Sequence, residues 1–576
     1  MRWSAPWLIG SALILAVSPL WFPIVTLFST PDAWQSLLEG GRLARLGGQS
    51  LLLATASASL ALLIGLPTAI LLERSPLPGR LLLRFALRLG LVIPLPILAI
   101  VWQGSLGVGG WLRLMLQCDS PYQPWDQGIL PAILIHTVHG IPWVVLLMGL
   151  ALHRVESTLE EDARLRMPPW QVLWRVTVPR CRVMLGIAWA IVAVQCLTEI
   201  TVTDLMLVRT YAEEVYTQAV LQTIGPARAM AVSLPGIVLP AIGFVVLLRR
   251  GAFADLPRGE SRPLAPLLVV KRRWIRILVG GMLGGIGLAC LLIPLGTLVW
   301  KLGGGGDRPW NVSIASTELF RAIRIAGWLG IRSLIESLLV AVIVATGTLR
   351  LLDALRNRPR LRGAVLIVAV VAWLMPGPLI GLGLKQAIDI ALDTEARLLP
   401  AGGPMRTVLY DSPESPLPVW WAQGLRIFPW CVLILAPTLW QIPREYHEWA
   451  TLEGWSNWQR FRRISWPWAH SAWIRATVVS MIMAMTELPA SKLVSIPGHD
   501  RLILELFNQM HYGVSRTVAA LSLVQISICL GILLAIWGGV RHDAGILISS
   551  NETDNPRGSD SVPETERFSE SALDQN

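Results

Sequence analysis

Charged residues are scarce in this sequence. Asp, Glu, Lys and Arg make up 15% of its 576 residues, whereas hydrophobic residues make up 53% and the mean hydropathy is +0.55. A soluble chain of this length needs far more charge to cover its surface, so the composition excludes an ordinary soluble protein. Lysine is rarest, and the lysines are Lys271, Lys301, Lys385 and Lys492. None of them follows a glycine, whereas a P-loop needs Gly-Lys before Ser or Thr. The sequence therefore lacks this ATP-binding motif.

Cysteine and histidine are also few, with six and eight residues. The cysteines are scattered, without the spacing of a metal site or a disulfide framework. His136 and His139 lie three residues apart in an apolar run, but two imidazoles are an incomplete ligand set. We expect no catalytic residues, no bound metal and no cofactor.

Apolar runs of a length that spans a membrane recur along the chain. A bilayer core needs about 20 apolar residues in a helix. Residues 6–28, 50–72, 129–152, 275–300 and 519–537 are clear examples. Hydropathy windows of this size predict an all-α polytopic membrane protein with about twelve transmembrane helices. The first run continues past its one small-residue cleavage candidate, so we interpret it as a retained span.

Arginine is concentrated in alternate loops between these runs, which explains the net charge of +11 without nucleic acid. Residues 74–88, 249–276 and 350–362 are three such loops. Positive residues favour the cytoplasmic side, so this pattern places these loops and both termini in the cytoplasm. We expect a multi-pass protein of a bacterial inner membrane.

The second half of the chain repeats the first. Glu161 and Ala163 follow one apolar run, and Glu448 and Ala450 follow another. Each segment then passes through a Trp- and Arg-rich stretch to an apolar residue and a proline, and each enters a new run with a Thr-Glu pair inside it. The offset between equivalent residues stays within a residue or two of 288, which indicates a duplication.

The repeat predicts two homologous halves of six helices each. The predicted regions are a first helix with an outside loop (1–48), a first transmembrane domain (49–248), a cytoplasmic linker (249–274), a helix with an outside loop (275–329), a second transmembrane domain (330–540) and a disordered cytoplasmic tail (541–576). The tail is polar and acidic and has few aromatic residues, a composition typical of disorder.

The two repeated loops resemble the signature of binding-protein-dependent ABC permeases, which reads Glu-Ala-Ala, three residues, Gly, nine residues, Ile-x-Leu-Pro. The second loop fits the signature with Glu448, Ala450, Gly454, Ile464 and Pro467. The first loop is looser: Glu161, Ala163 and Pro179 fit, Met167 takes the glycine position, and the spacing is one residue short. We expect the second loop to be the more sensitive one.

This resemblance implies the pore-forming subunit of an importer. In the family, such loops dock into separate ATPase subunits, and a solute-binding protein delivers the solute from the other side of the membrane. The joined halves and Glu487-Leu488-Pro489-Ala490 are similar to iron(III)-type permeases. Thiamine, phosphonate, polyamine or another small solute remains an alternative.

Three acidic residues in or near the repeated spans are candidates for the solute pathway: Glu199, Asp204 and Glu487. A carboxylate near the membrane centre costs about 2.5–3.5 kcal/mol on insertion scales, so it usually faces a polar interior. Glu199 and Glu487 occupy equivalent positions and could line a common pore. The alternative is that each one bonds to a neighbouring helix end and fixes packing.

Two other classes compete with this interpretation. An ion-coupled secondary transporter also contains repeats and charges in the membrane, but it gives no reason for the paired loops. A membrane enzyme needs acidic and histidine clusters in large outside loops, and the outside loops here are short. Asp389, Asp393 and Glu395 form the main acidic group.

Overall fold

The computed structural model describes residues 4–35, 40–107, 110–117, 123–220, 226–249, 268, 272–304, 309–399, 403–411, 415–496, 501–510 and 513–553. Most of the predicted linker 249–274 lies outside this described part, as do residues 554–576 of the predicted tail. The chain divides into two compact units, Met1–Cys529 and Leu530–Asn576. The described part of the second unit, 530–553, is helical, although its last residues had been predicted as disordered tail.

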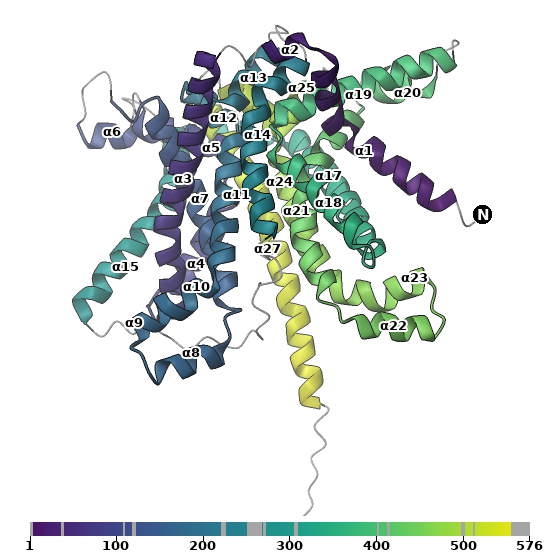
Figure 1. Cartoon of the computed structure of the whole chain (residues 1–576). Coiled ribbons are helices and arrows are strands. Elements are labelled where there is room, and N and C mark those ends of the chain that lie inside the picture. Colours follow the sequence, from purple (N-terminus) through teal and green to yellow (C-terminus); the bar gives the residue numbers. More distant parts are fainter. Residues whose placement is uncertain are drawn as a thin grey trace, which may run out of the picture. The chain divides into compact units, whose positions relative to one another are not determined.

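The described residues form helices and no strands, which confirms the all-α prediction (Figure 1). Seven helices are long and apolar enough to cross a membrane. Two further pairs of helices pass the same test together but are bent at a short break, which allows up to nine spans among the described residues. The seven are Ala44–Arg74, Leu95–Met115, Ile129–Leu152, Arg273–Gly303, Val312–Ala354, Leu417–Trp440 and Arg516–Leu534. The polytopic class is confirmed, and the total of twelve stays a prediction.

The internal repeat is visible in the helix bounds. Helices α7 (Ile129–Leu152) and α21 (Leu417–Trp440) have 24 residues each, and their first residues are 417 − 129 = 288 positions apart. Five-residue π-helical segments at Leu173–Thr177 and Phe461–Ser465 have the same offset, 461 − 173 = 288. These elements, including the π-helical segments, therefore recur at equivalent positions in the two halves.

Packing repeats as well. In the first half, α3 (Gly40–Arg74) packs against α7 and α11 (Arg182–Thr198). In the second half, α17 (Val312–Ala354) packs against α21 and α24 (Trp466–Thr486) in the same way. Each half thus builds its core from one long helix laid against two others.

The first helix of each half packs against its own half, α1 (Ser4–Ser29) against α14 (Pro226–Arg249) and α16 (Ile293–Gly303) against α17, and also against the opposite half. Helix α1 contacts α19 (Gly377–Leu398) of the second half. Helices α15 (Arg273–Gly287) and α16 with the π-helical turn between them contact α4 (Arg80–Gly90), α5 (Leu95–Leu106) and α7 of the first half. Gly383 permits one of these contacts, because a Cβ atom there would collide with the carbonyl oxygen of Pro19.

Candidate functional site: two loops and the cavity between the halves

The second loop is a compact pair of short helices joined at Gly454. Helix α22 (Arg444–Leu452) ends in a left-handed turn, with φ of +73° at Gly454. The amide of Trp455 donates to the carbonyl of Ala450 at 2.9 Å and closes the helix end. Ser456 and Gln459 then form a reciprocal cap on α23 (Asn457–Arg460). The glycine is therefore explained by backbone geometry.

The signature residues of this loop divide into buried and exposed ones. Ala450 and Ile464 are buried in one cluster with the ends of the spans, so they hold the loop on the membrane domain. Pro467 is the second residue of α24 and directly follows the π-helical segment Phe461–Ser465, in a helical backbone that continues across the junction. Glu448 is exposed. The loop is anchored by its apolar residues, and its carboxylate faces outward.

The first loop also pairs two short helices, but it makes the turn between them differently. Helix α8 (Ser157–Arg164) carries the buried Ala163 and the exposed Glu161. The amide of Met167 donates to the carbonyl of Ala163 at 2.9 Å, and Met167 has no left-handed φ. Pro168 then leads into α9 (Pro169–Val172). No glycine is needed here, because the turn is made without a positive φ.

The two loops differ again where they enter the membrane domain. Pro179 lies in α10 (Val178–Arg180), which is separated from α11 by a break at Cys181 and a bend of 65°. In the second half, α24 runs without a break from Trp466 to Thr486. The helix is therefore broken and bent where the first loop enters the membrane domain, whereas it is continuous where the second loop enters.

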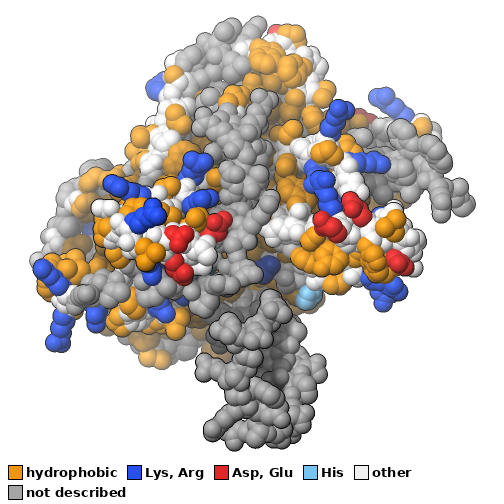
Figure 2. Space-filling model, turned by 60° about the horizontal axis from the view of Figure 1, so that its bottom comes forward, with side chains coloured by type: hydrophobic (Ala, Val, Ile, Leu, Met, Phe, Trp, Pro, Cys, Tyr) orange, Lys and Arg blue, Asp and Glu red, His pale blue; other side chains and the backbone are white. Residues whose placement is uncertain are grey.

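Both loops expose large apolar side chains beside charged ones (Figure 2). Leu165 and Leu452, which are 287 positions apart, are 86% and 87% exposed. Trp170 in the first loop and Trp449 and Trp458 in the second are more than half exposed. Exposed aromatic and leucine side chains next to charges are typical of a surface that binds another protein.

The first loop is held by a buried ion pair that the sequence did not reveal. Glu160, next to the predicted Glu161, accepts from Arg74 Nη2 at 2.7 Å and from Thr177 Oγ1 at 2.7 Å. Arg74 is 1% exposed and also donates to the carbonyl of Leu152 at 3.2 Å. This network ties α8 to the end of α3 and to the π-helical turn before α10.

The second loop has a counterpart with the charges redistributed. Ser465, equivalent to Thr177, donates to Asp353 at the end of α17. Arg356 donates to the carbonyl of Ile442 at 2.6 Å and contacts His447 of α22. Burial and then the neighbouring Arg356 guanidinium lower the pKa of His447 to about 4, so the imidazole is neutral at pH 7. Here the fixed carboxylate belongs to the span and not to the loop.

Glu199 and Glu487 lie in one cavity between the two halves. The cavity has a volume of about 160 Å³. His139 from α7, Gln195 and Thr198 from α11, and Arg426 from α21 also line it. Asp204, the third predicted pathway residue, is not among the cavity-lining residues.

Each of these carboxylates also caps a short helix. Glu199 accepts from the amides of Thr201 and Val202 at 2.6 and 2.9 Å, at the start of α12 (Thr201–Leu205). Glu487 accepts from the amides of Ala490 and Ser491 at 2.9 and 3.0 Å, in α25 (Pro489–Val494). The two interpretations left open by the sequence are therefore compatible, since the same side chains cap helices and face the cavity.

The cavity contains polar groups that are not fully used by the protein. Arg426 donates through Nη1 to the carbonyl of Met375 at 3.2 Å and is attracted by Glu487. Within the described residues, His139 Nδ1 and Gln195 Oε1 are buried without a hydrogen-bond partner. Buried polar atoms without partners are costly, so these groups are suited to a polar solute or to water.

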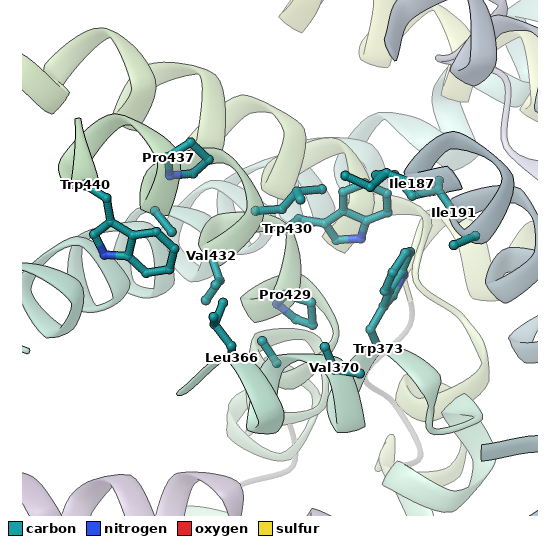
Figure 3. A pocket seen from close by; sticks show the side chains of 14 residues that line it. Ile187, Ile191, Leu366, Val370, Trp373, Pro429, Trp430, Val432, Pro437 and Trp440 are labelled. Carbon is teal, nitrogen blue, oxygen red and sulfur yellow. The ribbon is translucent and has the colours of Figure 1, made fainter. Parts of the chain in front are cut away.

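An apolar pocket adjoins this cavity through Trp373 and Trp430, which line both (Figure 3). Its other walls include Ile187, Ile191 and Pro429, and Trp440 lies at the far end. No group of three or more His, Cys, Asp or Glu that could hold a metal occurs in the part of the chain that was described. The polar cavity thus borders an apolar pocket, and this pocket lies toward the loop ends of the spans.

The repeat relates several of these residues, although sequence comparison alone missed them. His139 and Arg426 are equivalent at an offset of 426 − 139 = 287. They differ in residue type, so no repeated letter marked them. Gln195 was missed for the same reason, since Met483 stands at its equivalent position.

Comparison with known families identifies part of the chain. The model of the family described as "Binding-protein-dependent transport system inner membrane component" matches residues 337–540. This match begins inside α17, covers the whole second loop and the Glu487 region, and ends inside α27 (Arg516–Thr553). No curated protein matches the chain.

Proposed function

Because residues 337–540 belong to the binding-protein-dependent inner membrane components of transport systems, we propose that the whole chain is the pore-forming permease of one ABC importer, with a diverged first half. The observation that carries this proposal is the repetition of α7, the π-helical turn and the loop at an offset of 287–288. The cavity then lies between two equivalent halves, where a pathway between them would run.

The partners follow from the same proposal. Separate ATPase subunits would bind the two loops, whose exposed carboxylates and apolar side chains face away from the spans. A solute-binding protein would deliver the solute on the opposite side. Under the positive-inside rule the loops and both termini are cytoplasmic, in the inner membrane of a bacterium. The chain itself then performs transport and no covalent chemistry.

Iron(III) is the solute that we propose, on the resemblance of the Glu487 segment to iron(III)-type permeases. The cavity supports a cationic or polar cargo, since Glu199 and Glu487 both face it. Thiamine, phosphonate, polyamine or another small solute in the same class is the alternative. An ion-coupled transporter is the alternative from another class, and the exposed paired loops speak against it.

Uptake of labelled iron(III) tests the solute. A strain that lacks this chain is expected to lose most ATP-dependent uptake of iron(III) supplied at limiting concentration, and the intact gene should restore it. A strain carrying Glu487→Gln is the matched comparison, since the substitution removes a cavity charge and keeps the side-chain shape. Normal iron uptake together with the loss of uptake of another solute would overturn iron(III) as the solute and would leave the importer class standing.

Substitution of the exposed loop residues tests the coupling to ATPase subunits. Glu448→Gln is expected to reduce solute uptake at least several-fold, and its repeat mate Glu161→Gln is expected to reduce it less. Both side chains are exposed, so neither change should alter the free energy of unfolding by more than about 0.5 kcal/mol. Co-purification of ATPase subunits with each variant is the accompanying measurement. Unchanged uptake and unchanged association in both variants would falsify the docking role.

A further inference from the structure

Two tryptophans at equivalent positions of the repeat are stacked on each other between the halves. Pro142-Trp143 in α7 and Pro429-Trp430 in α21 correspond at an offset of 430 − 143 = 287. Their ring centroids are 5.2 Å apart, with 28° between the ring planes. Both side chains are more than nine-tenths buried. The pair therefore joins the two halves at a point that the repeat makes equivalent.

This pair lies on the loop side of the polar cavity. Trp143 follows His139 by four residues, and Trp430 follows Arg426 by four, in helices that run toward the loops. Four residues of helix correspond to a rise of about 6 Å. Trp430 lines the polar cavity and also the apolar pocket below it. Trp430, one ring of the stack, thus stands between the polar cavity and the pocket on its loop side.

A third indole packs against the stack. Trp373 packs edge-on against Trp430, with centroids 6.1 Å apart and 69° between the planes. Aromatic pairs in such geometries contribute about 0.5–1.5 kcal/mol beyond the area that they bury. Such a contact is stable enough to close a pathway, and weak enough to be broken when two halves move apart.

The halves also meet on the opposite side of the cavity. Lys492 in α25 is the repeat mate of Asp204 in α12, at an offset of 492 − 204 = 288. Its ammonium lies 4.0 Å from the ring centroid of Phe507 and 5.8 Å from that of Tyr216, which belongs to the first half. Asp204 also attracts this ammonium. The cavity therefore lies between two cross-half contacts of different chemistry, one aromatic and one charged.

We propose that the Trp143–Trp430 stack is the closure of the cavity on the loop side, and that the protein opens by unstacking these two rings. This inference rests on the proposed function, since it assigns a closure to the cavity that the proposed function places on the solute pathway. The two rings come from different halves, so any separation of α7 from α21 must break the stack. A solute in contact with Glu199 and Glu487 could then pass toward the loops.

Thiol labelling from the loop side tests the closure without ATPase subunits or solute. Gln195→Cys places a thiol in the cavity wall, in full-length protein whose native cysteines have been replaced. Inverted membrane vesicles are exposed to a small, charged, membrane-impermeant thiosulfonate reagent. Adding Trp143→Ala and Trp430→Ala is expected to raise the labelling rate about tenfold or more. The paired Phe substitutions at both positions should keep labelling slow, since they preserve an aromatic contact.

Trp440→Ala is the matched control, because it removes an indole from the far end of the apolar pocket and should leave the rate unchanged. Only variants whose size-exclusion profile in detergent is unaltered are compared. If the variant with both Ala substitutions fails to fold, the variant with both Phe substitutions still tests the closure. An equal labelling rate with both tryptophans removed, or fast labelling in the Phe pair, overturns the closure.

A second measurement separates this inference from the proposed function. When ATPase subunits are assembled on the Gln195→Cys protein with both tryptophans intact, the labelling rate from the loop side should differ several-fold between the nucleotide-free and ATP-trapped states. If the labelling rate does not respond to ATP but still rises when both tryptophans are replaced, the ATP-driven importer is contradicted and the closure by the tryptophan stack is retained. A response to ATP that persists without both tryptophans contradicts the closure alone.

Discussion

Glu160→Gln should destabilise the protein by about 3–5 kcal/mol, the usual cost of removing one partner of a buried ion pair. The substitution leaves the Arg74 guanidinium, which is 1% exposed, without its carboxylate. Arg74 would retain the carbonyl of Leu152, and Thr177 would lose a charged acceptor. The free energy of unfolding is measured in mixed micelles by titration with a denaturing detergent.

Glu161→Gln is the matched control, since it changes the neighbouring carboxylate of the same helix. Glu161 is exposed, so its substitution should shift the unfolding free energy by no more than about 0.5 kcal/mol. The pair of variants thus separates a buried carboxylate that fixes the loop from an exposed one. Equal stability of the two variants would show that the Arg74–Glu160 pair does not anchor the loop.

Glu487→Ala should abolish uptake and lower the free energy of unfolding by about 2–4 kcal/mol, because it removes a buried carboxylate that is bonded and close to two cations. The side chain is 7% exposed and accepts from two amides and from the hydroxyl of Ser491. Arg426 and Arg501 are both attracted by it, and Arg501 is 3% exposed. Without Glu487, these two guanidinium groups lose part of their countercharge.

Glu199→Ala is the comparison within the repeat and should cost less. Glu199 caps α12 in the same manner, but the charged neighbour that acts on it is Asp204 and not an arginine. Its loss should therefore cost about 1–2 kcal/mol, the value of a helix cap. Uptake and unfolding are measured on both variants in parallel. A larger loss of stability for Glu199→Ala than for Glu487→Ala would show that capping, and not countercharge, dominates.

The helical class and the position of the two loops could be predicted from the sequence, because apolar runs and a repeated Glu-x-Ala pattern depend only on local spacing. The sequence raised the convergence of Glu199 and Glu487 as one of two possibilities, since equivalent residues meet only where they lie close to the axis that relates the two halves. The structure places both in one cavity. Asp204 was grouped with them because it is close in sequence, but it belongs to the next short helix.

The remaining residues of the site could not be predicted, for identifiable reasons. Glu160 and Glu161 are adjacent carboxylates, and only the orientation of α8 decides which one is buried against Arg74. His139 and Arg426 are equivalent but chemically different, so a search for repeated residue types does not find them. The tryptophan pair is related by 287 and the glutamate pair by 288, because the first loop is one residue shorter.

The packing of each first helix on both halves has a consequence for assembly. Helix α1 packs on the second half as well as on its own, and α15 with α16 packs on the first half in addition to α17, so each half has part of its packing surface covered by the other. Two such halves on separate chains would have to find each other in the bilayer before that surface was covered. Joining them in one polypeptide fixes a one-to-one stoichiometry and excludes pairs of identical halves. The unlike residues at His139 and Arg426 can then be maintained, because each cavity receives one of each.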